Sequence, residues 1–144
     1  GAGWMAEAPP PEAVRALRRP TPPLAFGLAL DVATAAMDLS DGIGSDTPRL
    51  AAASGVALDL DAASLPAHPA IAGAPELLRW QVSGGEDYQL LFTAPPEARG
   101  RVEALAGAHQ VAVHRIGVAR AGEGVTLTAP WPDPAFAHFR GDDR

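Results

Sequence analysis

The acidic segment Met37-Asp38-Leu39-Ser40-Asp41-Gly42 places two carboxylates three residues apart, with a hydroxyl group between them. A short apolar stretch ends here and a glycine follows, so we expect a strand end or a turn that brings the two acids together. Magnesium takes one or two protein carboxylates and leaves its other positions to water and phosphate. Asp38 and Asp41 are therefore candidate metal ligands. An Asx-type turn, in which the carboxylates accept backbone N–H groups, explains the same residues without a metal.

The segment Ser83-Gly84-Gly85-Glu86-Asp87-Tyr88 has two glycines followed by two carboxylates, and it leads into the strongest strand pattern of the chain. Glycines of this kind permit a positive φ or a close approach of two backbones. Sheet ends are where open mixed sheets place ligand groups. The carboxylates are thus candidates for ligand contact. A solvated loop with turn glycines is the alternative.

Aromatic side chains gather in the proline-broken tail, which holds Trp131, Phe136, His138 and Phe139. This tail could fold over a planar ligand. It could equally cover an apolar face of its own domain, which is the common fate of buried aromatic residues.

Composition limits the chemistry that the chain can perform. All eleven basic residues are arginine, because the sequence has no lysine, and cysteine is also absent. A Walker-type lysine loop, a zinc–thiolate site and a thiol nucleophile are therefore excluded. Any phosphate must be bound through a metal, an arginine or backbone amides.

The charge balance and the apolar pattern indicate which partners and which cellular location to expect. A formal net charge of −6 with scattered arginines argues against an extended nucleic-acid interface. No apolar run reaches the roughly 18 residues of a membrane span. The N-terminal residues lack the basic start and apolar stretch of a signal peptide. We therefore expect a cytoplasmic protein without membrane or nucleic-acid partners.

Hydrophobic periodicity predicts the elements that must position these residues. The first 20 residues read as a linker and a short helix. Thr47 is expected to cap a helix whose first residue is Pro48 and which stops at Gly55. The expected helices span 12–19, 24–36, 47–53, 75–82 and 95–106, and the expected strands span 36–39, 56–60 and 88–93, with a terminal hairpin of 111–118 and 124–128. This order predicts an α+β fold, a mixed sheet layered with helices.

Taken together, these segments resemble the C-terminal half of thiamine-monophosphate kinase, over roughly residues 12–139. DxSDG alone is moderately specific, but DxSDG followed at this distance by GGEDYxLLF is a strong match. The ending Phe136-Ala137-His138-Phe139 is similar to the aromatic-x-His-Phe ending of that family. The matching runs are Arg19-Pro20-Thr21-Pro22-Pro23, Gly27-Leu28-Ala29-Leu30, Ala36-Met37-Asp38-Leu39-Ser40-Asp41-Gly42, Ser54-Gly55-Val56-Ala57, Leu65-Pro66 and Gly84-Gly85-Glu86-Asp87-Tyr88-Gln89-Leu90-Leu91-Phe92.

The resemblance implies an architecture. The family belongs to the superfamily of aminoimidazole-ribonucleotide synthetase, whose members have two domains. The N-terminal domain carries most magnesium-binding carboxylates and forms a homodimer, and the C-terminal domain, an α/β/α layered α+β fold, closes the active site. Residues 21–144 resemble only this second domain, so we expect the N-terminal ATP- and magnesium-binding domain to be missing from the chain.

The resemblance also implies roles for individual residues. Asp38 and Asp41 match magnesium ligands, and Ser40 matches a residue that touches ATP. Glu86 matches a contact to thiamine phosphate. Phe136 is similar to the tail aromatic that packs on the substrate, and Phe139 is the alternative if the register differs.

The chain departs from the family pattern between Gly44 and Leu50. The family usually continues Asp-Leu-x-His-Ile, whereas this sequence reads Asp46-Thr47-Pro48-Arg49-Leu50. The departure leaves the carboxylates in place but puts any role of that histidine in doubt.

The implied activity is ATP-dependent phosphorylation of thiamine phosphate to thiamine diphosphate, with the isolated chain inactive. Two alternatives stay open. One is a superfamily relative that acts on another small phosphate acceptor, and the other is a non-enzymatic binding domain with the same fold.

Overall fold

The structure is a computed structural model that describes residues 11–132 of the 144-residue chain. Helices and strands follow one another in the predicted order. The helices are α1 (Pro11–Arg18), α2 (Leu24–Ala29), α3 (Ile43–Ser54), α4 (Leu77–Ser83) and α5 (Arg99–His109), and the strands are β1 (Ala35–Asp38), β2 (Ala57–Leu60), β3 (Leu90–Thr93), β4 (Gly117–Arg120) and β5 (Val125–Leu127). Short 3-10 turns span Ala62–Ser64, Pro69–Ile71 and Pro96–Ala98.

The strands form two sheets. β1 pairs with β3 in antiparallel fashion, with Asp38 opposite Leu90. The second sheet has the order β4-β2-β5, in which β2 is antiparallel to β4 and parallel to β5. It is therefore a mixed sheet with β2 at its centre.

The predicted terminal hairpin is wrong, because β4 and β5 do not pair with each other but flank β2. β2 is deeply buried, with Ala57, Leu58 and Leu60 at 1%, 5% and 5% exposure. A buried strand needs hydrogen-bond partners for its backbone on both edges. The central position of β2 supplies them, which a separate two-stranded hairpin would not.

The predicted helix over 24–36 is also wrong in its second half. α2 ends at Ala29, and β1 begins six residues later. The β-branched residues Val32 and Thr34 favour extended backbone at this point. Thr34 is already aligned with β3, since its N–H donates to Thr93 O at 2.8 Å and the two hydroxyl groups lie 2.8 Å apart.

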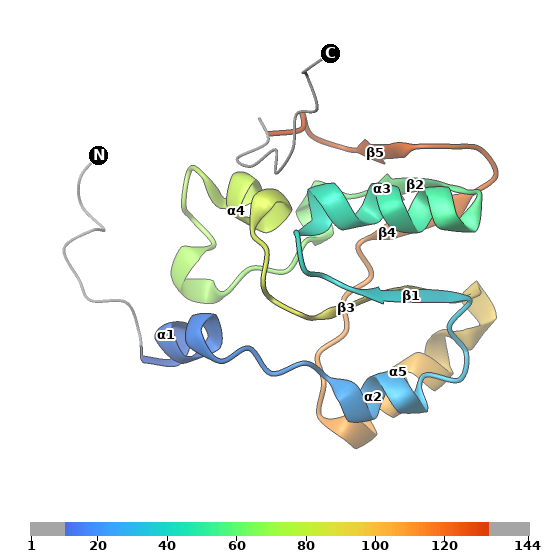
Figure 1. Ribbon diagram of the computed structural model, residues 1–144, viewed down its shortest axis with the longest axis horizontal. Helices are drawn as coiled ribbons and strands as arrows, with labels where there is room; N and C mark the ends of the chain where they lie inside the picture. Colours follow the sequence, from blue (N-terminus) through green and yellow to red (C-terminus); the bar gives the residue numbers. More distant parts are fainter. Residues whose placement is uncertain (1–10, 133–144) are drawn as a thin grey trace, which may run out of the picture.

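Helices cover both sides of the β1–β3 sheet (Figure 1). On one side, α2 and α5 bury Phe26, Leu30 and Leu105 against partly buried Phe92. On the other side, Leu91 packs with Leu50 of α3 and with β2. The alternation of Leu91 and Phe92 follows from successive side chains of a strand pointing to opposite faces. The predicted α+β class with layered helices is confirmed.

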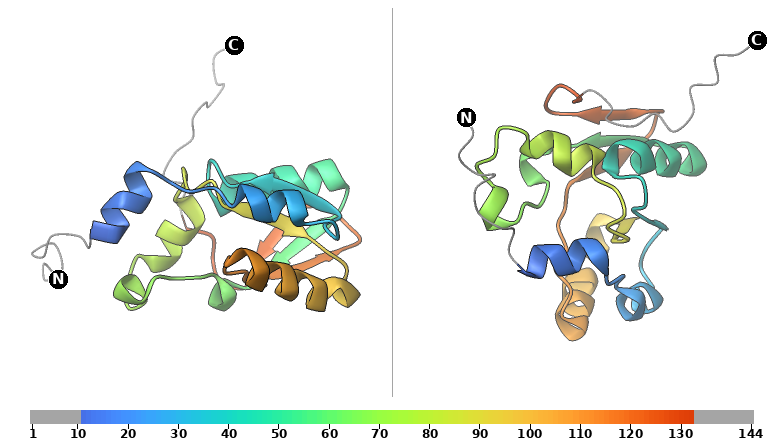
Figure 2. Two further views of the ribbon diagram at one scale, coloured as in Figure 1. Left: turned by 90° about the horizontal axis from the view of Figure 1, so that it is seen from below. Right: turned by 60° about the vertical axis from the view of Figure 1, so that its left-hand side comes forward.

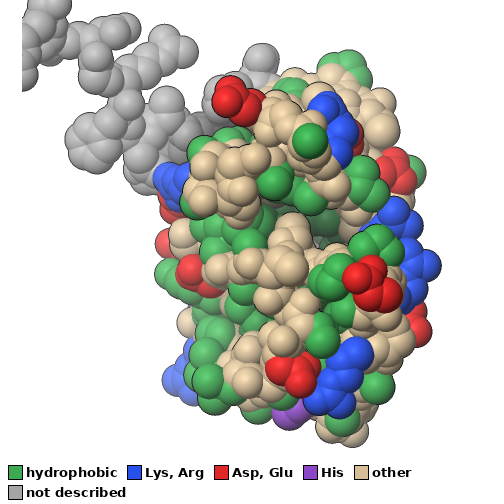
Figure 3. All heavy atoms as spheres, turned by 90° about the vertical axis from the view of Figure 1, so that its right-hand side faces the viewer, with side chains coloured by type: hydrophobic (Ala, Val, Ile, Leu, Met, Phe, Trp, Pro, Cys, Tyr) green, Lys and Arg blue, Asp and Glu red, His purple; other side chains and the backbone are tan. Residues whose placement is uncertain are grey.

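Two peripheral features complete the description. α1 stands at the edge of the molecule, away from both sheets (Figure 2). On the face drawn in Figure 3, acidic and basic side chains are interspersed with apolar ones. Within residues 11–132, no helix is long and apolar enough to cross a bilayer.

Candidate functional site

The two acidic segments singled out in the sequence meet through their backbones. The loop that follows β1 (Leu39–Gly42) lies against the loop that precedes β3 (Gly84–Tyr88), and we refer to this pair as the crossing. The N–H of Glu86 donates to Ser40 O at 2.8 Å, and the N–H of Tyr88 donates to Leu39 O at 2.9 Å. The crossing thus continues the β1–β3 pairing beyond the strand ends and fixes Ser40 beside Glu86.

Glycines make this close approach possible. Gly42 has φ +93°, and a Cβ at this position would lie 2.5 Å from Gly84 O. A Cβ on Gly85 would lie 2.6 Å from Ser40 O. Real Cβ atoms do not come this close to backbone oxygen, so both positions require glycine. The turn glycines thus lie where the two backbones come close, with Gly42 against Gly84 and Gly85 against Ser40.

Two non-glycine residues of the crossing have a left-handed backbone. Glu86 has φ +66° and Tyr88 has φ +51°. This conformation costs a residue with a side chain about 1–2 kcal/mol. The flanking backbone hydrogen bonds hold both residues in place, so the carboxylate of Glu86 projects from a defined, strained position.

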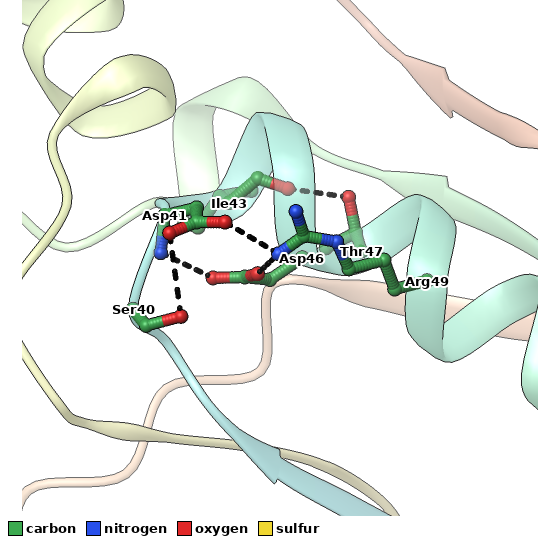
Figure 4. A network of polar contacts seen from close by, with 6 residues as sticks. All are labelled: Ser40, Asp41, Ile43, Asp46, Thr47 and Arg49. Atoms are coloured by element: carbon green, nitrogen blue, oxygen red, sulfur yellow. Dashed lines mark hydrogen bonds and ion pairs between the residues drawn. The ribbon is translucent and has the colours of Figure 1, made fainter. Parts of the chain in front are cut away.

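A polar network surrounds Asp41 at the start of α3 (Figure 4). Arg49 Nη1 donates to Asp41 Oδ2 at 2.6 Å and to Asp46 Oδ1 at 2.8 Å. The backbone N–H of Asp41 donates to Asp46 Oδ2 at 2.9 Å. Asp46 has no exposed surface, whereas the side chains of Asp41 and Arg49 are 42% and 58% exposed. A buried carboxylate therefore holds the turn from within, and an exposed arginine joins it to Asp41.

The predicted cap of α3 is wrong, because the helix begins at Ile43 and Thr47 lies inside it. Thr47 is fully buried, and its hydroxyl donates to Ile43 O one turn back. Gly42 takes the N-cap position with its positive φ. The start of the helix is thus determined by the crossing, a tertiary contact, rather than by local capping. The predicted stop is confirmed, since Gly55 has the left-handed conformation at the C-cap.

Asp38 is the last residue of β1, and its side chain is exposed. Its partner Leu90 shares the same sheet face. Ser40 Oγ lies 3.5 Å from Asp41 Oδ1. The structure therefore places Ser40, Asp41 and Glu86 in the crossing and Asp38 in the strand directly before it.

The donor chemistry of this stretch fits magnesium, since it offers carboxylate oxygens and no sulfur or imidazole. Within residues 11–132, no group of three or more acidic or histidine side chains is arranged to hold a metal. Two carboxylates are nevertheless a sufficient protein contribution for an ion that keeps water and phosphate as its other ligands.

Asp87 differs from its neighbours in its surroundings. Partial loss of solvation raises the pKa of its carboxyl group above the ordinary value of 3.8. The charged form is thus disfavoured at this position, although Asp87 is an exposed residue of the crossing itself.

Phe136 and Phe139, the tail aromatics expected to pack on the substrate, lie outside the described residues. Trp131 is described and is 40% exposed. A Cβ added to Gly44 would lie 3.8 Å from its ring, so Trp131 sits over the first turn of α3.

Sequence reasoning missed the role of Asp46 and Arg49. A signal was present, because an acidic residue soon after a loop glycine is stabilised by the N-terminal end of a helix dipole. The predicted helix start at Thr47 leaves Asp46 outside the helix, so this signal is lost. In the sequence, Arg49 stands out only as a departure from the family pattern.

Comparison with known proteins decides the family. Residues 8–130 match the family described as AIR synthase related protein, C-terminal domain. The chain belongs to this family. The resemblance stated from the motifs is thereby confirmed, and the layered fold is the one expected of such a domain.

Members similar to this chain include enzymes of known activity. A thiamine-monophosphate kinase of Salmonella typhimurium is 44% identical over 93 residues, which are 62% of this chain and 29% of that enzyme. The solved thiamine-monophosphate kinase of Stenotrophomonas maltophilia K279a has a TM-score of 0.77 at 37% identity, covering 84% of this chain and 40% of its own. A second structure, AaThiL complexed with AMPPCP and TMP, has a TM-score of 0.72 at 28% identity, covering 90% and 42%. The chain thus spans well under half the length of these relatives.

Proposed function

We propose that this chain is the C-terminal domain of an ATP-dependent kinase that converts thiamine phosphate to thiamine diphosphate. The observation that supports this best is the crossing itself, in a domain whose relatives are thiamine-monophosphate kinases. It brings the acidic turn beside the Gly84–Tyr88 loop, which supports one site for the residues proposed to bind the two substrates. A related structure with AMPPCP and TMP bound supports the same pair of ligands.

In this proposal, Asp38 and Asp41 hold magnesium, Ser40 touches ATP and Glu86 faces thiamine phosphate. Phe136, or Phe139 in the other register, packs on the substrate. The chain works together with the N-terminal domain of the longer kinase, which forms a homodimer in the cytoplasm. The isolated chain is inactive, since it holds only part of the site.

The reaction suits these residues. A phosphate oxygen of thiamine phosphate attacks the γ-phosphorus of ATP, a new P–O bond forms, and the bond to the β-phosphate breaks to release ADP. The attacking oxygen is already ionised, so no strong general base is needed. Bound magnesium would supply the positive charge that offsets repulsion between the two phosphates. Glu86 would attract the cationic thiazolium ring, while the crossing holds both contacts at a fixed separation.

The test uses the longer kinase that carries this domain. ADP release should require both thiamine phosphate and magnesium, and the double variant Asp38→Asn with Asp41→Asn should lower it by at least about 100-fold. Asp31→Asn is the matched control, because it removes an exposed carboxylate from an ion pair with arginine elsewhere in the chain. Unchanged magnesium-dependent turnover in the double variant would contradict the proposed roles of Asp38 and Asp41 as magnesium ligands. Phosphorylation of another acceptor, with thiamine phosphate ignored, would overturn the substrate.

A further inference from the structure

Arg49 is the feature of the site that the proposed reaction does not use. It stands where the family pattern has histidine, and it is permanently charged, unlike histidine. Its Nη1 bonds two carboxylates at once, at 2.6 Å to Asp41 and 2.8 Å to Asp46. A fixed positive charge therefore lies on an oxygen of Asp41, the residue proposed as a magnesium ligand.

The two anchors of Arg49 are unequal. Asp46 is fully buried, and its second oxygen accepts the Asp41 backbone N–H at 2.9 Å. Leaving this carboxylate without a counter-charge would be costly, because a buried charge loses its solvation. Asp41 is 42% exposed and returns to water or to another cation at little cost. The bond to Asp46 is thus the permanent anchor, and the bond to Asp41 is the one that can be exchanged.

Deprotonation of Arg49 cannot perform this exchange, because arginine stays charged at every physiological pH. A cation that competes for the Asp41 carboxylate can release it.

We propose that Arg49 is a resident counter-cation of the magnesium site, which holds Asp41 until a divalent cation displaces it, while Asp46 retains the arginine. This inference rests on the proposed function for the identity of the metal ligand. Arg49 acts through Asp41 and is a positioning residue. It keeps the carboxylate oriented before the metal arrives, and it weakens metal affinity by competition.

The test follows binding of Mn²⁺ alone to the 144-residue chain, through paramagnetic broadening of the Asp41 backbone amide resonance in NMR spectra. Broadening is measurable even for weak binding. Arg49→Gln should bind Mn²⁺ about two- to fivefold more tightly, the range expected for loss of one exposed ion pair. The matched control is Arg101→Gln, whose partner Asp31 forms a similarly exposed pair at 3.1 Å. It changes the net charge equally and should leave the affinity unchanged.

A double variant separates competition from local charge. Asp46→Asn with Arg49→Gln keeps the local net charge of the wild type, keeps an acceptor for the Asp41 N–H, and leaves no buried carboxylate unpaired. It should still bind Mn²⁺ more tightly than the wild type. An affinity equal to that of the wild type would mean that charge alone governs binding, and it would overturn the proposal. If Arg49→Gln alone fails to fold, the Mn²⁺ affinity of the double variant still tests the proposal.

Failure of this inference is distinguishable from failure of the proposed function, because no nucleotide or thiamine phosphate is present. Absence of broadening at Asp41 in both the wild type and the variants would overturn the counter-cation role. The kinase assay would then be judged by its own result.

Discussion

Two aspartate–arginine pairs in this molecule differ in the geometry of their hydrogen bonds. Asp59 of β2 receives both Nε and Nη2 of Arg120 from β4, and Thr126 of β5 donates to it at 2.7 Å. Asp41 receives one nitrogen of Arg49 at 2.6 Å and a distant hydroxyl at 3.5 Å. Both carboxylates are partly exposed, and they differ in that Asp59 forms a bidentate pair with its arginine, whereas one nitrogen of Arg49 is shared between Asp41 and Asp46.

The difference teaches where a ligand site can exist. The bidentate pair at Asp59 ties three neighbouring strands together and leaves no oxygen available. At the crossing, backbone hydrogen bonds from Glu86 to Ser40 and from Tyr88 to Leu39 join the two loops, so this contact does not use the side chains of Asp38 and Asp41. The carboxylate of Asp59 joins three strands and stabilises the fold, whereas that of Asp41 lies at a turn whose backbone is held independently of it.

The largest expected effect comes from a substitution that disrupts the backbone contact at the crossing. Gly42→Ala should destabilise the chain by about 3 kcal/mol or more, because its Cβ would lie 2.5 Å from Gly84 O and its φ is positive. Urea unfolding measures the loss. The control is Gly107→Ala in α5, where nothing lies within 4 Å, and it should raise stability by up to about 1 kcal/mol. Equal midpoints for the two variants would show that the crossing does not need its glycine.

The next prediction compares the loss of stability when the aspartate that holds each arginine, Asp46 or Asp59, is removed. Asp46→Ala should cost about 2–3 kcal/mol, because the Asp41 N–H loses its acceptor inside the protein. Asp59→Ala should cost clearly less, since its partners return to water. The two variants are compared by denaturant unfolding at neutral pH. A larger loss at Asp59 would contradict the assignment of Asp46 as the buried anchor.

A smaller effect tests strain in the crossing. Glu86→Gly should stabilise the fold by about 1 kcal/mol, because glycine adopts φ +66° without a steric penalty. Glu86→Ala removes the same carboxylate but keeps a Cβ, and it should give no such gain. Thermal unfolding of both variants separates strain from charge. If both gain equally, the carboxylate rather than the backbone is the source of the cost.

The smallest effect concerns the Asp59–Arg120 pair and pH. The hydrogen bond from Arg120, followed by that from Thr126, lowers the pKa of Asp59 below its ordinary value of 3.8. Its folded pKa is below its unfolded one, so its contribution is present above 3.8 and is lost as the pH falls through the folded value. Asp59→Asn should therefore lose less stability than the wild type on acidification, as measured by unfolding midpoints below about pH 5. If the unfolding midpoints of Asp59→Asn and of the wild type fall in parallel as the pH decreases, the predicted contribution of Asp59 is wrong.

Local sequence signals predicted part of this structure well. Gly55 ends α3 because glycine adopts the left-handed C-cap, and the Gly84–Gly85 pair marked a close backbone approach. The acidic turn of Asp38 and Asp41 was likewise found from residue types and spacing alone. Each of these features carries a local sequence signal, although the partner of the Gly84–Gly85 pair lies more than 40 residues away in the chain.

The features that were missed depend on distant contacts. The position of β2 between β4 and β5 is set by burial across the whole domain, which no local alternation reveals. The start of α3 at Gly42 follows from contact with Gly84, so the favourable Thr47-Pro48 cap was overridden. The bridging role of Arg49 became visible only once the helix started early enough to turn it toward Asp41.

The central place of β2 also determines when this chain can fold. Among residues 11–132, no strand pairs with the strand next to it in sequence. Arg120 lies 61 residues after its partner Asp59, Thr126 lies 67 residues after it, and Thr34 and Thr93 are 59 apart. Such non-local pairing slows folding, because long loops must close before any contact forms. During synthesis β2 therefore remains unpaired until β4 has emerged, and its second edge waits for β5, whereas the acidic turn acquires its contacts as soon as the Gly84–Tyr88 loop follows.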